Sequence, residues 1–481
     1  MRWGKARVTQ RVNDRRFTDL WRHLGRDARR DWAGFHMPGH GYGSGFPRSF
    51  RHALARMDIT EVPGMDDLSH PGGILRDAQD RLAALMDADR SFFLVNGSST
   101  GIIAMMTALC RPGDSLIVPR ASHRAVYHGL ALGGISPAYL YTKERDNRPA
   151  LPAPENVNAT LTKYPQVKGM VLTSPDYWGR CADVAAIAQV LHRRGKALLL
   201  DQAHGAHFGF HPALPPHGGT QGADAWVQSA HKTLPALTQS AWLHRSRSAL
   251  LSGERLAQQI NVLQTTSPSY PMMGGLDYAR YWLAQDARDA YTGLLGRIDR
   301  GIATIERVTP VRRAELVRDG GVVNTDPTRL VLDLSGMGMG AGEVEVRLLA
   351  NKVRVEWAQG AHLVLICTPW HRTRDFSRLI GALRRIPRQS SAARPKGLSP
   401  LPEAEMILPI GQALDRTASK IDYREAAGQV AGAFVIPYPP GIPLLCPGER
   451  VTAAHVEWIG RCIETGRTPA GVDGGYMDVL Q

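Results

Sequence analysis

One lysine of the sequence lies in a mostly apolar segment, where burial would change the reactivity of its amine. Lys232 directly follows His231 in AWVQSAHKTLPALTQSAWLH, residues 225–244, and is the only fixed cation of that stretch. Because burial disfavours the ammonium form, the pKa of such a lysine falls and its amine becomes a usable nucleophile for a carbonyl carbon. The alternative is an exposed pair in which both side chains extend to solvent. The pattern marks Lys232 as a candidate nucleophile.

Polar residues follow four short apolar runs that are typical of buried strands. The runs are SFFLV, GMVL, KALLL and AWVQ. Because ligands bind beyond the carboxyl ends of the strands in open parallel sheets, the residues after these runs are expected at one edge of one sheet. They are Asn96, Gly97, Ser98, Ser99, Thr100, Thr173, Ser174, Pro175, Asp176, Asp201, His204, His207, Ser229, His231 and Lys232.

Each of these groups also has a simpler interpretation. NGSSTG before a helix is often a turn with an N-cap, and it matches neither a Walker A loop nor a GxGxxG fingerprint. The free N–H groups at such a helix start nevertheless favour a phosphate. Asp201, His204 and His207 could bind zinc, although no HExxH spacing supports a metal site.

The groups together meet the requirements of one cofactor. Pyridoxal 5′-phosphate (PLP) has an aldehyde for an amine, a pyridine nitrogen for a carboxylate and a phosphate for a helix start. Lys232 would form a Schiff base with the aldehyde, and Asp201, 31 residues earlier (232 − 201), would pair with the ring nitrogen. The combination predicts a PLP site and makes metal the second alternative.

Composition and charge narrow the class of protein. The chain has 481 residues, 43% of them hydrophobic, which is enough for a large core in two or three domains. A net charge of +14 makes nucleic-acid binding an alternative, but the arginines are dispersed rather than interleaved with aromatic residues. No apolar run reaches the roughly 20 residues needed to cross a bilayer, and no apolar segment follows the basic N-terminus as in a secretory signal. Neither a nucleic-acid nor a membrane partner is expected.

The cysteines indicate a compartment. They show no CxxC spacing, and an odd, scattered set in a long chain predicts free thiols in a reducing cytoplasm. The five are Cys110, Cys181, Cys367, Cys446 and Cys462.

The order of patterns along the chain predicts an α/β protein of several parts. Residues 1–40 form a basic N-terminal arm with a short helix, and residues 41–300 alternate apolar runs with helical segments, as in a large domain with a mainly parallel sheet. A smaller α/β domain follows over 301–386, a Pro/Ser/Arg-rich linker over 387–402 and a C-terminal domain over 403–481.

Several long and rare strings recur from residue 36 almost to the end of the chain. They include HMPGH, DITEVPGMDDLSHPGG, SFFLVNGSSTG, VPRASHRAVYHGL, DQAHGAHFGFHPALP, SAHKTLPALTQ, QTTSPSYPMMGGLDYAR and PYPPGIPLLCPGE. In these strings the chain resembles the ornithine/lysine/arginine decarboxylase family of fold-type-I PLP-dependent enzymes, in its shorter bacterial form. The resemblance implies a PLP-binding fold-type-I domain over 41–300 and an Orn/Lys/Arg decarboxylase C-terminal domain over 403–481.

The resemblance also implies a role for each candidate residue. Lys232 would hold PLP and Asp201 would bond the protonated pyridine nitrogen, while His123 would stack on the ring and His204 would lie beside the cofactor. Glu449 would lie near the distal cationic group of the substrate. The phosphate would be held by Ser98, Ser99, Thr100, Ser229 and His231, and by Thr265, Thr266 and Ser267 of a neighbouring subunit. The active unit would then be a homodimer with shared sites.

The sequence departs from the family pattern around the expected site. An acid gained at Asp176 and a lysine lost at Gly41 could suit a dibasic amino acid, which makes Asp176 a candidate for substrate binding. The same changes could mark an altered reaction. The departures are Gly41, Gly73, Arg124, Asp176, Trp178 and Gln202.

The reaction implied by the resemblance is decarboxylation of arginine, lysine or ornithine to agmatine, cadaverine or putrescine, with release of CO2. Because the cofactor supports several reactions, an aminotransferase or an amino-acid oxidase acting on a basic amino acid is the alternative. A catalytically silent relative is a third hypothesis, against which the Lys232–Asp201 pair counts. Pocket depth, which the sequence does not give, decides among the three amino acids.

Overall fold

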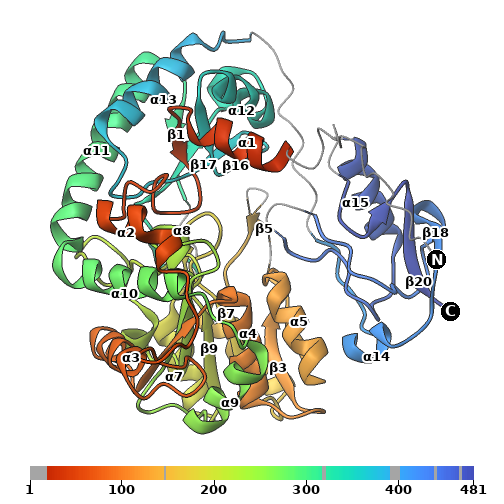
Figure 1. Cartoon of the computed structure of the whole chain (residues 1–481). Helices are drawn as coiled ribbons and strands as arrows, with labels where there is room; N and C mark the ends of the chain where they lie inside the picture. The colour runs from red at the N-terminus through yellow and green to blue at the C-terminus, as the bar shows by residue number, and fades with distance from the viewer. Residues whose placement is uncertain are drawn as a thin grey trace, which may run out of the picture.

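The computed structural model describes residues 19–142, 144–145, 148–316, 321–389, 401–437, 441–464 and 468–481. Its largest sheet has seven strands in the order β2-β11-β10-β9-β7-β3-β4, and only β11 within it runs opposite to its neighbours (Figure 1). The strands are β2 (Arg90–Leu94), β3 (Ser115–Pro119), β4 (Ser136–Leu140), β7 (Gly169–Thr173), β9 (Ala197–Asp201), β10 (Ala225–Gln228) and β11 (Ala241–Arg245). The predicted strands and the mainly parallel sheet are confirmed.

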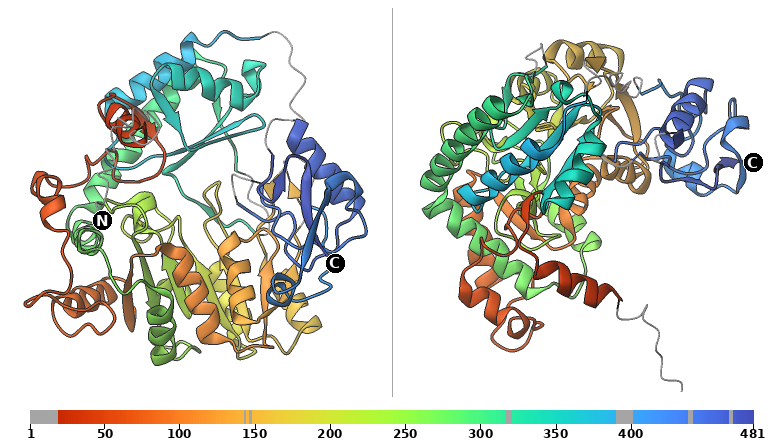
Figure 2. Two further views of the ribbon diagram at one scale, coloured as in Figure 1. Left: turned by 45° about the vertical axis from the view of Figure 1, so that its right-hand side comes forward. Right: turned by 90° about the horizontal axis from the view of Figure 1, so that it is seen from above.

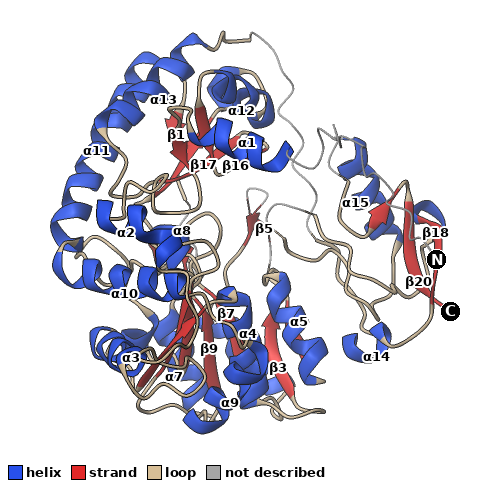
Figure 3. Cartoon of the chain, in the orientation of Figure 1, coloured by secondary structure: helices blue, strands red, loops and turns tan. Residues whose placement is uncertain are grey.

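Helices cover both faces of this sheet, which explains why its strands read as continuous apolar runs (Figure 3). In β9, Leu198 and Leu200 pack into one hydrophobic cluster, while Leu199 between them packs into another on the opposite face. The helices of this region are α3 (Ile74–Leu85), α4 (Gly97–Leu109), α5 (Arg124–Gly133), α6 (Pro154–Lys163), α7 (Val184–His192), α8 (Ala230–Thr233), α9 (Gly253–Leu263) and α10 (Tyr270–Gln285).

A second, smaller α/β unit lies above the large sheet in Figure 1, reached through the long helix α11 (Ala287–Val308). The boundary proposed at residue 300 lies inside this continuous helix. The antiparallel four-stranded sheet has the order β12-β14-β17-β16. Its elements are β12 (Arg312–Arg313), β14 (Arg329–Asp333), β16 (Trp357–Gln359) and β17 (His362–Ile366), with α12 (Ala341–Ala350) and α13 (Thr373–Arg385).

The segment predicted as an N-terminal arm contributes to this smaller unit. Helix α1 (Asp19–Ala28) is followed by β1 (Ala33–Phe35), which pairs in parallel with β15 (Val353–Val355). Residues 1–18 lie outside the described part of the chain. Helix α2 (Arg48–Ala53) then leads back to the large sheet.

The C-terminal segment forms a separate hydrophobic cluster beside the other two units (Figure 2). It contains α14 (Ile410–Leu414), α15 (Ala453–Glu464) and a sheet of β18 (Ala418–Asp422), β19 (Val472–Asp473) and β20 (Tyr476–Leu480). Most of the predicted linker, residues 390–400, lies outside the described residues. Two further short pairs complete the strands: β5 (Glu144–Arg145) with β6 (Arg148–Pro149), and β8 (Arg180–Cys181) with β13 (Asn324–Thr325).

Two further predictions concern the whole chain. All five cysteines are buried free thiols, as the sequence predicted. Within the described ranges, no helix is both long enough and apolar enough to cross a membrane.

Candidate active site

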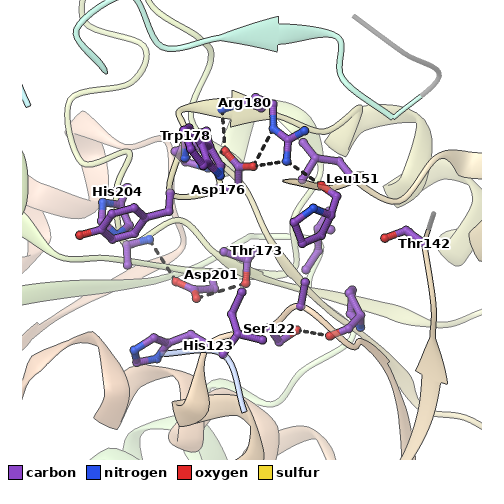
Figure 4. A pocket seen from close by; sticks show the side chains of 18 of the residues that line it. Ser122, His123, Thr142, Leu151, Thr173, Asp176, Trp178, Arg180, Asp201 and His204 are labelled. Carbon is purple, nitrogen blue, oxygen red and sulfur yellow. Dashed lines mark hydrogen bonds and ion pairs between the residues drawn. The ribbon is translucent and has the colours of Figure 1, made fainter. Parts of the chain in front are cut away.

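A cavity lies at the carboxyl edge of the large sheet, and residues of all three units line it (Figure 4). The large sheet and its loops contribute the residues with reactive groups, which are Ser98, His123, Thr173, Asp176, Asp201, His204 and Lys232. The smaller unit adds Trp357 and Gln359, and the C-terminal segment adds Leu401, Pro437, Ile442 and Trp458. Of the strand-end residues predicted to gather at one sheet edge, seven line this cavity: Ser98, Thr173, Pro175, Asp176, Asp201, His204 and Lys232.

Lys232 lies on the short helix α8, directly after β10. Burial lowers the pKa of its ammonium group to about 8, although the charge of Asp201 opposes this shift. The Nζ atom lies 3.0 Å from Nε2 of His204. Gly39 holds the helix from the other side, because its N–H donates to the His231 carbonyl and a Cβ there would lie 2.6 Å from the Thr233 backbone. These contacts fix the lysine at the cavity wall.

Asp201 ends β9 at the floor of the cavity and is 2% exposed. Its Oδ1 accepts from the N–H of Ala203 at 3.1 Å and its Oδ2 from the hydroxyl of Thr173 at 3.3 Å. Burial raises the pKa of this carboxyl, while Lys232 lowers it. A buried acid of this kind gains from any cationic N–H placed in the cavity.

Two histidines flank Asp201 in Figure 4. His123 precedes α5, where its Nδ1 accepts from the N–H of Ala125 at 3.2 Å, so the helix start orients the ring. Burial lowers the pKa of His123 to about 3 and the pKa of His204 well below its usual value. Both rings are therefore neutral at physiological pH.

The candidate phosphate residues differ in where they lie and in the hydrogen bonds that they make. Ser98 lines the cavity at the start of α4, and its hydroxyl oxygen accepts from the Ser229 hydroxyl at 2.7 Å. Thr100 donates to the Asn96 carbonyl, and Ser99 is exposed. His231 is engaged with the Ser240 carbonyl through Nδ1 at 2.9 Å.

Asp176 lines the cavity, but its carboxylate already has partners. Both the side chain and the backbone N–H of Arg180 donate to it, with an Nη2–Oδ2 distance of 2.7 Å, and the N–H of Trp178 donates as well. Because this charge is neutralised locally, it is poorly placed to bind a second cation. Trp178, in contact with Trp357 at 5.0 Å between ring centroids, instead offers an aromatic wall.

Glu449 does not line the cavity, which differs from the position expected for it. The residue is fully buried, and its carboxylate accepts from Arg120 at 3.0 Å, from the Tyr139 hydroxyl at 2.9 Å and from the N–H of Cys446 at 2.8 Å. Arg120 also donates to the Leu444 carbonyl. The acid therefore fastens the C-terminal segment to the end of β3 and lies outside the lining of the cavity in this chain.

Comparisons with known proteins agree with this geometry. The sequence pattern of the Orn/Lys/Arg decarboxylase major domain matches residues 18–319, and that of the C-terminal domain matches residues 405–467. The chain belongs to the Orn/Lys/Arg decarboxylase family. Protein YaaO of Bacillus subtilis (strain 168) is 34% identical over 463 residues, which cover 93% of this chain and 94% of that protein. Arginine decarboxylase of the same organism is 30% identical over 478 residues, covering 96% and 97%.

Solved structures give the same fold. Lysine decarboxylase LdcF of Francisella novicida superposes with a TM-score of 0.76 at 19% identity, over 95% of this chain and 80% of that one. A serine palmitoyltransferase of Sphingomonas wittichii superposes with a TM-score of 0.55 at 14% identity, over 78% of this chain and 98% of that one. The fold-type-I architecture expected from the sequence is confirmed.

Other candidate phosphate-binding and metal-binding residues of this Orn/Lys/Arg decarboxylase family member lie away from the cavity. Thr265, Thr266 and Ser267 are exposed after α9 and do not line it. His207, part of the zinc alternative, bonds instead with Asp326 and Thr328. Within the described ranges, no three acidic, histidine or cysteine residues gather as a metal site.

Some residues of the site carry no signal in the sequence. Arg329 begins β14 and contacts His204, yet it precedes an ordinary apolar run. Trp357 and Trp458 come from the smaller unit and the C-terminal segment, more than 100 residues after Lys232. Only the fold brings them to the cavity.

The buried Arg120–Glu449 pair makes a stability prediction. Arg120→Met is expected to lower the free energy of unfolding by roughly 3–5 kcal/mol, because it leaves a fully buried carboxylate without its cation. Urea unfolding followed by circular dichroism measures this. Arg424→Met in the exposed Arg424–Asp422 pair is the control and should change little. An Arg120 variant as stable as the control would contradict the proposed fastening.

Proposed function

We propose that the protein decarboxylates a basic amino acid, with PLP as cofactor, to give the corresponding amine and CO2. The observation that carries this proposal is Lys232, a half-buried lysine with a lowered pKa in a cavity that also holds Asp201 and His123. The relatives include arginine and lysine decarboxylases, which supports the reaction class.

The residues present fit the cofactor. The start of α4 offers backbone N–H groups beside the paired Ser98 and Ser229 hydroxyls, which suits a phosphate. Gly97 at this start has φ 83°, a conformation that favours glycine. Asp201 would accept from a protonated pyridine nitrogen, and the neutral His123 ring would stack on the cofactor face.

When bound, PLP draws electrons away from the substrate Cα so that CO2 can leave. The chain supplies the remaining functions. Lys232 provides the amine that binds the cofactor aldehyde and, once freed, holds a proton for return to Cα. Asp201 would keep the ring nitrogen protonated, and the walls of the cavity would limit the access of water to it.

The aromatic wall of the cavity would contact the distal cation of the substrate. Trp178, Trp357 and Trp458 line it, and a guanidinium or ammonium group over such rings gains about 0.5–2 kcal/mol. Since Asp176 is paired with Arg180, these rings are the better candidates in this chain. Arginine, the substrate named for the relatives at 30% identity, is the first one to test.

The test is an assay with arginine, lysine and ornithine in parallel. CO2, the amine product, keto acid and peroxide are each quantified. CO2 and amine in equal amounts support decarboxylation. Keto acid without CO2 would establish transamination, and peroxide would establish oxidation. A colourless protein with none of these products would leave the silent relative as the surviving hypothesis.

We also propose a homodimer in which each subunit completes the site of the other. Apolar side chains are exposed at Met57 and Val62, between α2 and α3, and at Val262, near the end of α9, with exposures of 40%, 46% and 73%. Burial of such side chains against a second copy would be favourable. Thr265 and Thr266, directly after α9, are exposed as well.

Complementation tests the shared site. Lys232→Ala protein and Thr265→Val/Thr266→Val protein are each expected to be nearly inactive. After joint unfolding and refolding in equal amounts, activity should return to about one quarter of wild type, since half of the dimers would carry one intact site. Light scattering should give twice the 52.6 kDa chain mass. No recovery in a mixture of proven dimers would contradict sharing.

A further inference from the structure

Arg329 is a buried cation whose guanidinium points to the reactive end of the cavity. It begins β14 in the smaller unit, is 2% exposed, and its Nη2 lies 2.9 Å from Nδ1 of His204. Nε2 of the same ring lies 3.0 Å from Nζ of Lys232. Three side chains from three separate strand ends therefore form one continuous chain of hydrogen bonds.

The chemistry of arginine fixes where the protons of this chain lie. A guanidinium donates and never accepts, so Nδ1 of His204 must be the acceptor and carries no proton. The single proton of the neutral ring then lies on Nε2, which faces Lys232. Because Nε2–H is a donor, it can form the 3.0 Å hydrogen bond only if Nζ of Lys232 accepts, and an ammonium group cannot accept.

We infer that Arg329 is a positioning residue that selects the Nε2–H tautomer of His204 and so holds Lys232 as a free amine, ready for an aldehyde. The proton that Lys232 gives up passes to solvent before the cofactor binds. This inference deepens the proposed function, since it concerns the same lysine, but it makes claims about the chain alone that do not depend on the substrate.

Other charges act on this pair from every side. Two carboxylates favour the ammonium form of Lys232, and the cationic Arg329 opposes it, with burial as the largest influence. Two further histidines surround His204 and are themselves neutral at physiological pH. These groups are Asp201, Glu356, Arg329, His123 and His231. With burial lowering the pKa of Lys232 to about 8, the ammonium form would still be favoured near neutral pH, and the Nε2–H tautomer of His204 shifts the balance towards the amine.

The first test measures the tautomer directly. Protein freed of cofactor and labelled with ¹⁵N-histidine is studied by NMR, and the His204 signals are assigned by their loss in His204→Asn. Protonated Nε2 and unprotonated Nδ1 are expected in the wild type. A proton on Nδ1, or a doubly protonated ring, would overturn the inference without any variant of Arg329.

The second test measures the amine. The rate at which PLP attaches to Lys232 in the cofactor-free protein is followed across pH, with borohydride trapping and mass spectrometry to identify the residue. Arg329→Met keeps an unbranched apolar stem but removes the guanidinium donors, so His204 can accept from an ammonium group. The half-maximal rate should then move to a pH higher by roughly one unit or more.

Matched variants separate positioning from packing. Arg329→Lys retains a cationic donor and should keep the wild-type pH profile. Arg313→Met, an exposed arginine on the neighbouring β12, should also keep it. An unchanged profile in a folded Arg329→Met protein would refute the role. If PLP attaches with the expected profile but no amino acid is decarboxylated, the proposed function fails and this inference stands.

Discussion

Lys232→Ala protein should show no detectable turnover of any basic amino acid. The substitution removes the amine that binds the cofactor aldehyde and later carries a proton to Cα, so kcat is expected to fall by at least about 10⁴-fold, the scale seen when an enzyme nucleophile is removed. The side chain lines the cavity rather than packing into the core. Its loss should therefore leave the fold intact.

CO2 release and circular dichroism are the two measurements for this variant. Wild-type protein should be yellow, and borohydride should abolish its absorption band, whereas Lys232→Ala protein should lack the borohydride-sensitive linkage. Lys232→Arg is the control, because it restores a long side chain at this position without a usable nucleophile. Full activity in the alanine variant would remove the basis of the proposed function.

Asp201→Asn should separate cofactor binding from chemistry. The amide can still accept from the Ala203 N–H, so the local structure should persist. It cannot carry the negative charge that holds a pyridine nitrogen protonated. We expect bound PLP with kcat lower by about 10²–10⁴-fold, in the range reported for loss of a key electrostatic partner.

A second buried aspartate offers a matched control. Asp224 is 2% exposed and accepts from the backbone N–H groups of Leu198 and Leu250 and from His192, at the opposite end of the sheet from the cavity. Asp224→Asn should lower stability and leave kcat unchanged. If Asp201→Asn instead behaves like Asp224→Asn, the pairing with the ring nitrogen is wrong.

The sequence was sufficient for the sheet and for the core of the site. Short apolar runs followed by polar residues identify strand ends, and parallel strands bring their carboxyl ends together. The grouping of Ser98, Asp201, His204 and Lys232 in one cavity follows from that rule. Their roles toward a cofactor remain predictions that the variants above test.

The sequence did not reveal which charged side chains have a partner elsewhere in the fold. Glu449 looked available for a substrate, but Arg120, 329 positions earlier, neutralises it in the core. Asp176 is neutralised by Arg180, only four residues on, yet an i,i+4 spacing in a loop predicts no such pair. Arg329 reaches His204 only because the smaller unit folds over the large sheet.

Part of the cavity wall is built from Pro437, Ile442 and Trp458, all in the C-terminal segment. Exchanging residues 401–481 between relatives should therefore transfer part of their substrate preference. Such a chimera would need a matching buried ion pair, with an arginine at the position of Arg120 and an acid at the position of Glu449. Hybrids that lack one partner of this ion pair should be recovered as insoluble chains. Hybrids that keep both partners should show how much of the substrate specificity depends on the part of the cavity wall contributed by the C-terminal segment.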